Sequence, residues 1–166
     1  MLDRPFAKAM RQLKAAGLRP TRQRLALAKL LLDTAPRHVT AEELFQEARA
    51  AGIPVSLATV YNTLHQFTGA GIMSEVVVGS GQSYFDTNPT SHYHYFDPTN
   101  GQIIDIPPEQ VRFLRLPSSP PGMVIERIDV VVRIRNADRA QQPAAARHAA
   151  EDSSSESRLV TSDESA

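Results

Sequence analysis

Hydrophobic residues in the first 70 positions recur at the spacing of an amphipathic helix. Phe6, Met10 and Leu13 lie four and three residues apart, so they share one face of a predicted helix from Pro5 to Ala16. Three further helices are predicted, each opened by a threonine or serine suited to capping its N-terminus. They run from Arg22 to Thr34 after Thr21, from Thr40 with Glu43 at the capping-box spacing, and from Leu57 to about Thr68 after Ser56.

Beyond residue 72 the pattern changes to short apolar runs that are typical of strands. Two hairpins are predicted, with turns at Gly79–Gly81 and Asp97–Gly101. Their strands are Met73–Val78, Gln82–Asp86, His92–Phe96 and Gln102–Ile106. A short helix is expected over Pro108–Leu116, and a long, central strand over Met123–Arg135. Helices followed by a glycine-turned hairpin indicate a winged helix-turn-helix.

The predicted fold class is therefore α+β, with two domains and a tail. An N-terminal winged helix-turn-helix domain with its hinge covers residues 1–88, and a small α/β domain for dimerisation and sensing covers 89–136. Residues 137–166 have few large apolar side chains to offset the entropy of ordering, so we expect a disordered tail.

Charge and cysteine usage narrow the function. The chain has 18 basic and 18 acidic residues, yet eight basic residues and one acidic residue fall among the first thirty. This basic start favours a polyanionic partner. The absence of cysteine excludes disulfides, iron–sulfur clusters and Cys-ligated zinc. With no apolar run of about 18 residues and no secretory signal, we expect a cytoplasmic protein with no membrane partner.

The predicted helix from Leu57 has no charged residue, which is unusual for a solvated face. Hydroxyl, amide and aromatic groups on such a helix can read base edges in the major groove of double-stranded DNA. The candidate base-reading residues are Ser56, Thr59, Tyr61 and Asn62, and Lys14 and Arg19 are candidates for phosphate contacts. The alternative is a small helical domain with an ordinary basic rim.

A second group of polar residues predicts a metal site. His92 and His94 project from one face of a predicted strand, and the hairpin register places His94 opposite Asp105, with Asp86 near enough to join them. Such thiol-free ligands suit one Mn²⁺, Fe²⁺ or Zn²⁺ ion. The alternatives are an exposed His-Tyr-His-Tyr strand and a metal hydrolase or oxygenase. The strands are too few for a catalytic barrel and no general base stands out, so we expect no enzyme.

Three segments resemble the ferric uptake regulator (Fur) superfamily over about residues 10–135. They are Val55-Ser56-Leu57-Ala58-Thr59-Val60-Tyr61-Asn62-Thr63-Leu64, Gly17-Leu18-Arg19-Pro20-Thr21-Arg22-Gln23-Arg24, and His38 before Thr40-Ala41-Glu42-Glu43-Leu44. The resemblance implies a homodimer or higher oligomer of winged-helix units that regulates transcription in response to metal. It also implies five ligands for one regulatory ion: His38, Asp86, His92, His94 and Asp105.

The chain departs from the family at three places. It lacks the two Cys-x-x-Cys pairs of the structural zinc, has Glu126-Arg127-Ile128 where some members place a second metal site, and has Asn62 where arginine often follows the recognition tyrosine.

A cysteine-free, His-rich member most closely resembles the iron response regulator (Irr) branch. That resemblance implies operator binding under iron limitation and release by haem, held here by His92, His94 and His65, with His38 a further candidate. The alternative function is a repressor activated by Mn²⁺, Fe²⁺ or Zn²⁺. The sequence leaves haem and a bare ion open, because both would use the same histidines.

Overall fold

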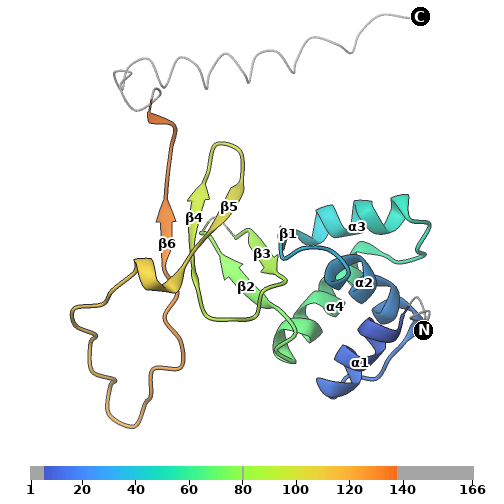
Figure 1. Ribbon diagram of the computed structural model, residues 1–166, viewed down its shortest axis with the longest axis horizontal. Helices are drawn as coiled ribbons and strands as arrows, with labels where there is room; N and C mark the ends of the chain where they lie inside the picture. Colours follow the sequence, from blue (N-terminus) through green and yellow to red (C-terminus); the bar gives the residue numbers. More distant parts are fainter. Residues whose placement is uncertain (1–5, 80, 138–166) are drawn as a thin grey trace, which may run out of the picture.

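The computed structural model describes residues 6–79 and 81–137. Within them the helices gather at one end, the two sheets lie beside them, and residues 107–130 extend away from both (Figure 1). The elements are α1 Ala7–Ala15, α2 Arg22–Leu32, β1 His38–Val39, α3 Ala41–Ala50, α4 Leu57–Gly69, β2 Ser74–Val77, β3 Ser83–Asp86, β4 Tyr93–Asp97, β5 Gln102–Ile106, the 3₁₀ helix η1 Pro108–Gln110 and β6 Val131–Arg133. The predicted tail lies outside this description except for Ala137.

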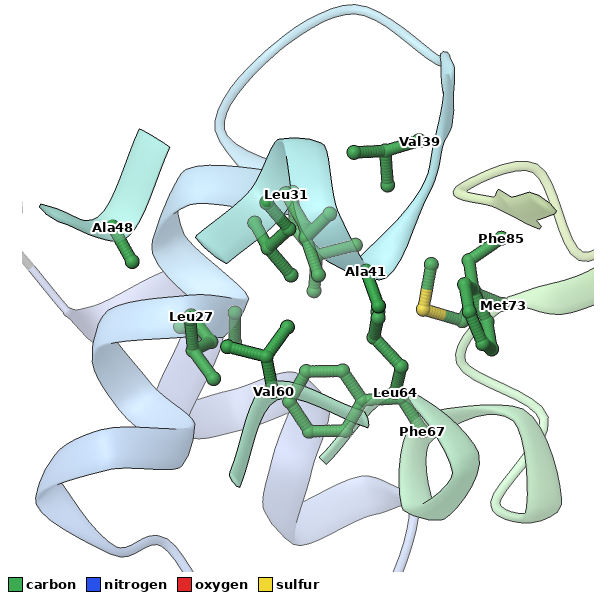
Figure 2. Close-up of a cluster of buried hydrophobic side chains, with 14 of the residues drawn as sticks. Leu27, Leu31, Val39, Ala41, Ala48, Val60, Leu64, Phe67, Met73 and Phe85 are labelled. Atoms are coloured by element: carbon green, nitrogen blue, oxygen red, sulfur yellow. The ribbon is translucent and has the colours of Figure 1, made fainter. Parts of the chain in front are cut away.

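The four helices pack around one hydrophobic core. Leu27 and Leu31 of α2, Val60 and Leu64 of α4, and Phe67 point into its centre (Figure 2). Each of these side chains is at most 1 % exposed. The predicted N-caps are present: the Thr40 hydroxyl accepts from the Glu43 N–H while the Glu43 carboxylate accepts from the Thr40 N–H. The mixed fold of helices and two small sheets confirms the predicted α+β class.

The first sheet joins the helical half to the rest of the chain. Its strand order is β1-β3-β2, with antiparallel pairing throughout. β2 and β3 form the predicted hairpin, or wing. β1 was not predicted, because two residues carry no periodic pattern. It pairs His38 with Asp86, and the ladder continues as the Thr87 N–H donates to the Arg37 carbonyl at 3.0 Å.

The second sheet has the order β5-β4-β6. The β4–β5 hairpin has the predicted register, with Asp97 opposite Gln102 and His94 opposite Asp105. The strand predicted over Met123–Arg135 is wrong in length and position: only Val131–Arg133 pairs, in parallel with β4 at the edge of the sheet. β4 lies between β5 and β6, and the residues just before β6 form no strand, so Val124 remains 87 % exposed.

The helix predicted over Pro108–Leu116 is also too long, because only Pro108–Gln110 is helical. A second, smaller hydrophobic cluster connects the two sheets. It consists of Val76, Val78, Tyr84 and Phe96, with Ile103 and Val131 packed against it. Arg133 adds to this joint: its guanidinium donates to the Val78 carbonyl and lies 5.6 Å from the centre of the Phe96 ring. No helix among the described residues is long and apolar enough to cross a membrane.

Candidate metal centre

Five side chains far apart in the sequence converge on one point, and both sheets contribute to them. Each offers one imidazole nitrogen or carboxylate oxygen, and these five atoms lie within 4.8 Å of one another. The residues are His38, Asp86, His92, His94 and Asp105, the five implied as ligands by the sequence resemblance. The structure therefore brings the whole predicted set together.

Strand register explains how the set assembles. His38 of β1 is the pairing partner of Asp86 at the end of β3, so these two side chains share one face of the first sheet. His94 of β4 is likewise the pairing partner of Asp105 in β5. His92 comes just before β4, two residues from His94, and so projects on the same side. Two cross-strand pairs and one flanking histidine thus build the cluster.

The two carboxylates lie among three imidazole nitrogens. Asp86 Oδ2 is 2.9 Å from His92 Nε2 and 3.6 Å from the Nε2 atoms of His38 and His94. Asp105 Oδ1 is 3.1, 3.4 and 3.9 Å from the Nε2 atoms of His38, His92 and His94. All three histidines thus direct the same ring nitrogen at the same two oxygens.

Four of these atoms are buried without a hydrogen bond of good geometry: the Nε2 atoms of His38, His92 and His94, and Asp86 Oδ2. A buried polar atom left unpaired costs free energy comparable to a lost hydrogen bond. Four such atoms aimed at one point fit a shared cation, which accepts electron pairs from imidazole nitrogen and carboxylate oxygen alike.

In two of the ligands, the atom that faces away from the centre is hydrogen-bonded within the protein. His92 Nδ1 lies 2.7 Å from the Thr90 carbonyl oxygen, and Asp86 Oδ1 accepts from the Asn88 N–H at 2.8 Å. Outer partners of this kind orient ligands toward a metal. No sequence pattern indicated these two hydrogen bonds, because Asn88 and Thr90 lie on the irregular segment between β3 and β4.

Protonation states also suit metal binding. Burial lowers the pKa of His38, and the carboxylates of Asp86 and Asp105 offset this only in part. Desolvation pushes the pKa of the Asp86 carboxyl upward, but the adjacent His94 ring, the Asn88 N–H and the nearby histidine charges outweigh it, so the pKa lies below its usual value. Near pH 7 the imidazole of His38 is neutral and the Asp86 carboxyl is ionised, the forms that coordinate a metal.

Comparison with known proteins identifies the family. The model of the ferric uptake regulator family matches residues 15–116. The chain belongs to this family. Its members are DNA-binding, dimeric transcription regulators that respond to metal, and they are not enzymes.

Individual proteins and structures similar to this chain agree with this family assignment. The peroxide-responsive repressor PerR of Staphylococcus epidermidis is 35 % identical over 104 residues, covering 63 % of this chain and 69 % of the relative. The manganese-containing ferric uptake regulator structure from Pseudomonas aeruginosa superposes with a TM-score of 0.59 at 25 % identity, covering 82 % of this chain and 99 % of the other. The Vibrio cholerae ferric uptake regulator has a TM-score of 0.59 at 24 % identity, covering 77 % and 99 %.

The residues predicted to read bases in this Fur-family chain lie on the first half of α4. Ser56 is its N-cap: the hydroxyl accepts from the Thr59 N–H at 3.1 Å and lies 2.9 Å from the Thr59 hydroxyl. Asn62 is exposed one turn further on. The Tyr61 hydroxyl donates to Glu42 Oε1 of α3 at 2.7 Å, a contact that no sequence pattern indicated.

Lys14 and Arg19 are exposed at the end of α1 and in the following loop. His65 does not join the histidine cluster. Its Nδ1 lies 3.7 Å from Glu75 Oε2, and its ring stacks on Tyr61. The predicted grouping of His65 with His92 and His94 around one haem is therefore not what the structure shows, because α4 directs His65 toward β2 instead.

Proposed function

We propose that this chain is a transcription regulator in which a divalent cation, held by His38, Asp86, His92, His94 and Asp105, controls DNA binding through α4. The observation that supports this most is the convergence of three otherwise unpaired Nε2 atoms and a buried carboxylate oxygen on one point. A bound cation would neutralise the two carboxylates and supply the coordination bonds that these atoms lack.

The origin of the ligands supports a regulatory role. His38 and Asp86 belong to the first sheet, and His94 and Asp105 belong to the second. Ligands drawn from both sheets make metal affinity depend on how the winged helix is oriented relative to the second sheet. By linkage, metal then favours the orientation that assembles all five ligands.

The donor set favours Mn²⁺ or Fe²⁺ over Zn²⁺. Structural zinc sites are almost always four-coordinate, whereas five side chains converge here. The two carboxylates suit manganese, and the three imidazoles suit iron as well as zinc.

Haem is the second candidate, and one observation favours it. A groove of about 890 Å³ lies beside His92 and His94, with an apolar wall that includes Phe113, Leu116 and Ile125. Against it, a tetrapyrrole already occupies four coordination positions of its iron, leaving at most two for protein ligands. The five converging ligands therefore favour a bare ion, and with it the metal-activated repressor over the haem-released regulator of the Irr branch.

In the same proposal, Ser56, Thr59, Tyr61 and Asn62 contact base edges in the major groove, while Lys14 and Arg19 contact phosphates. The exposure of Ser56, Asn62, Lys14 and Arg19 supports this assignment, and Thr59 and Tyr61 beside them on α4 are half-buried. A dimer would present two such helices to two half-sites of an operator in double-stranded DNA.

The test is a titration of the purified protein with Mn²⁺, Fe²⁺ under anaerobic conditions, Zn²⁺ and haem. It is followed by gel-shift assays on duplexes that the wild-type protein selects from a random library in each ligand's presence and absence. We expect His92→Ala with His94→Ala to lose metal affinity by more than about 100-fold and to lose metal-dependent DNA binding. His65→Ala is the matched control, because this histidine lies outside the cluster, and it should bind metal like the wild type.

The haem-released alternative predicts the opposite effect of the double variant on DNA binding. In that case the double variant would stay on its DNA when haem is added while the wild type dissociates. A folded double variant that binds Mn²⁺ like the wild type would overturn the metal proposal.

A further inference from the structure

The DNA-facing surface contains one contact that the proposed function does not use. Tyr61 of α4 donates its hydroxyl hydrogen to Glu42 Oε1 of α3 at 2.7 Å. Glu42 is exposed in the first turn of α3, where nothing in the core requires a carboxylate. An acidic residue beside a surface that must approach phosphates weakens general DNA affinity, so its presence there calls for a compensating role.

The rest of the Tyr61 side chain is also held in place. Its ring packs against the hydrophobic core of the helical half. On another side it stacks on His65, with ring centres 6.4 Å apart and planes at 23°. The bond to Glu42 also raises the pKa of the Tyr61 hydroxyl, which keeps it protonated. The hydroxyl therefore has a fixed position and a fixed direction for its hydrogen.

We propose that Glu42 is a positioning residue for Tyr61 and makes the Tyr61–Glu42 pair an acceptor-only reader of DNA. This inference rests on the proposed DNA binding through α4. A phenol has one hydrogen to donate, and here the carboxylate takes it. Toward DNA the hydroxyl oxygen then only accepts, and the carboxylate does the same.

An acceptor-only pair discriminates among bases. In the major groove adenine and cytosine offer an amino group that can donate to it, and thymine offers a methyl group that can contact the tyrosine ring. Guanine presents only its N7 and O6 acceptors there. Guanine at the contacted position would therefore face two acceptors with no hydrogen between them, and we expect it to be rejected.

The experiment compares base preferences of variants at every operator position, using duplexes that the wild-type protein selects from a random library with Mn²⁺ present. Glu42→Ala frees the hydroxyl to donate to guanine, so discrimination against guanine at one position per half-site should fall about five- to tenfold. Glu42→Gln is the variant matched for charge: its amide oxygen can still accept from Tyr61, but its amino group adds a donor beside the phenol, so it should keep only part of that discrimination.

Both substitutions remove one negative charge, so both should tighten binding to unrelated DNA to the same extent. This separates the charge of Glu42 from its hydrogen bond. Tyr61→Phe removes the hydroxyl that Glu42 orients, so Glu42→Ala should change the base preference much less in the Tyr61→Phe background than in the wild type.

Two results would overturn the inference. One is a Glu42→Ala variant that changes the affinity for all sequences equally and leaves every base preference unchanged. The other is an additive loss in the combined variant, which would mean that the residues act separately. If the wild-type protein selects no sequence at all, the proposed function itself fails, and its failure is thus distinct from that of the Tyr61–Glu42 inference.

Discussion

The helical half of this protein buries fifteen hydrophobic residues in one cluster, whereas the second sheet shares a cluster of four with the first. Only one of those four, Phe96, comes from the second sheet. Along the chain from η1 to β6, side chains such as Leu114 and Val124 are almost fully exposed. The winged-helix half can therefore stabilise itself, while the second sheet depends on its contact with the wing.

This difference bears on regulation. A self-sufficient half keeps α4, the helix proposed to read DNA, folded independently of the second sheet. A dependent half can change its orientation when the few contacts at its joint change, because little free energy opposes the change. The ligand cluster lies where the winged-helix half meets the second sheet.

The largest effect is expected in the helical core. Phe67 is fully buried there, so Phe67→Ala should destabilise the protein by about 3–5 kcal/mol, measured by urea denaturation followed by circular dichroism at 222 nm. Phe6→Ala is the control, since Phe6 is 43 % exposed and should cost little. A loss below about 1 kcal/mol for Phe67→Ala would contradict a self-sufficient core.

Phe96→Ala probes the dependent half. It removes the only buried anchor of the second sheet in the shared cluster, and we expect a loss of about 3 kcal/mol, the lower end for a buried phenylalanine. The loss should appear in the hydrogen exchange of β4 and β5 while the amides of α2 and α4 keep their protection. Leu114→Ala, at a fully exposed position, should leave all of these unchanged. Equal loss of protection in the helices would show that the halves are not separable.

Gly79→Ala tests the joint between the halves. A methyl group at Gly79 would lie 2.5 Å from Arg133 Nη2, and the residue has a φ of +84°. Displacement of Arg133 together with backbone strain should cost about 1–3 kcal/mol in thermal or urea unfolding. Gly81→Ala is the matched control, because its φ is +76° but no atom lies within 4 Å of the added carbon. If the two variants lose the same stability, the Arg133 contact contributes nothing.

The smallest effect concerns the entry to β1. The Glu47 carboxylate forms two 2.6 Å hydrogen bonds with Arg37, and the guanidinium holds the pKa of Glu47 below its usual value. Both side chains are partly exposed, so Glu47→Gln should cost at most about 1 kcal/mol at pH 7.

The pKa of Glu47 is lower in the folded than in the unfolded protein. Its ion pair therefore contributes fully to stability above the unfolded pKa of about 4.3, and this contribution is lost as the pH falls through the folded pKa. Urea unfolding of wild type and variant at pH 7 and at pH 3 should show the difference shrinking at the lower pH. A difference that grows on acidification would have the wrong sign for this ion pair.

Local signals in the sequence predicted much of this structure. Cap residues such as Thr40 and Ser56 marked the helices, and the turn at Gly101 was enough to place His94 opposite Asp105. The boundaries of the four α-helices differed by one or two residues, as expected where helix ends are marked by few interactions.

Features set by distant contacts were not predictable in the same way. The β1–β3 pairing joins residues with no shared pattern, and only the family resemblance brought His38 to the cluster. The run from Met123 to Arg135 looked like one long strand, but β4 is only five residues long and its second edge pairs with Val131–Arg133 alone. The Tyr61–Glu42 bond links residues on separate helices and left no trace in either helix's own pattern.

The ligand cluster also bears on the unfolded chain. A protein without cysteine has no covalent cross-link, yet the five converging residues span positions 38 to 105. An ion bound to all of them would close long loops, much as a disulfide does, and would disfavour the unfolded ensemble by restricting its conformations. Its binding free energy would then contribute to folding stability as well as to signalling. The same five side chains would serve as both the sensor and the staple of the fold.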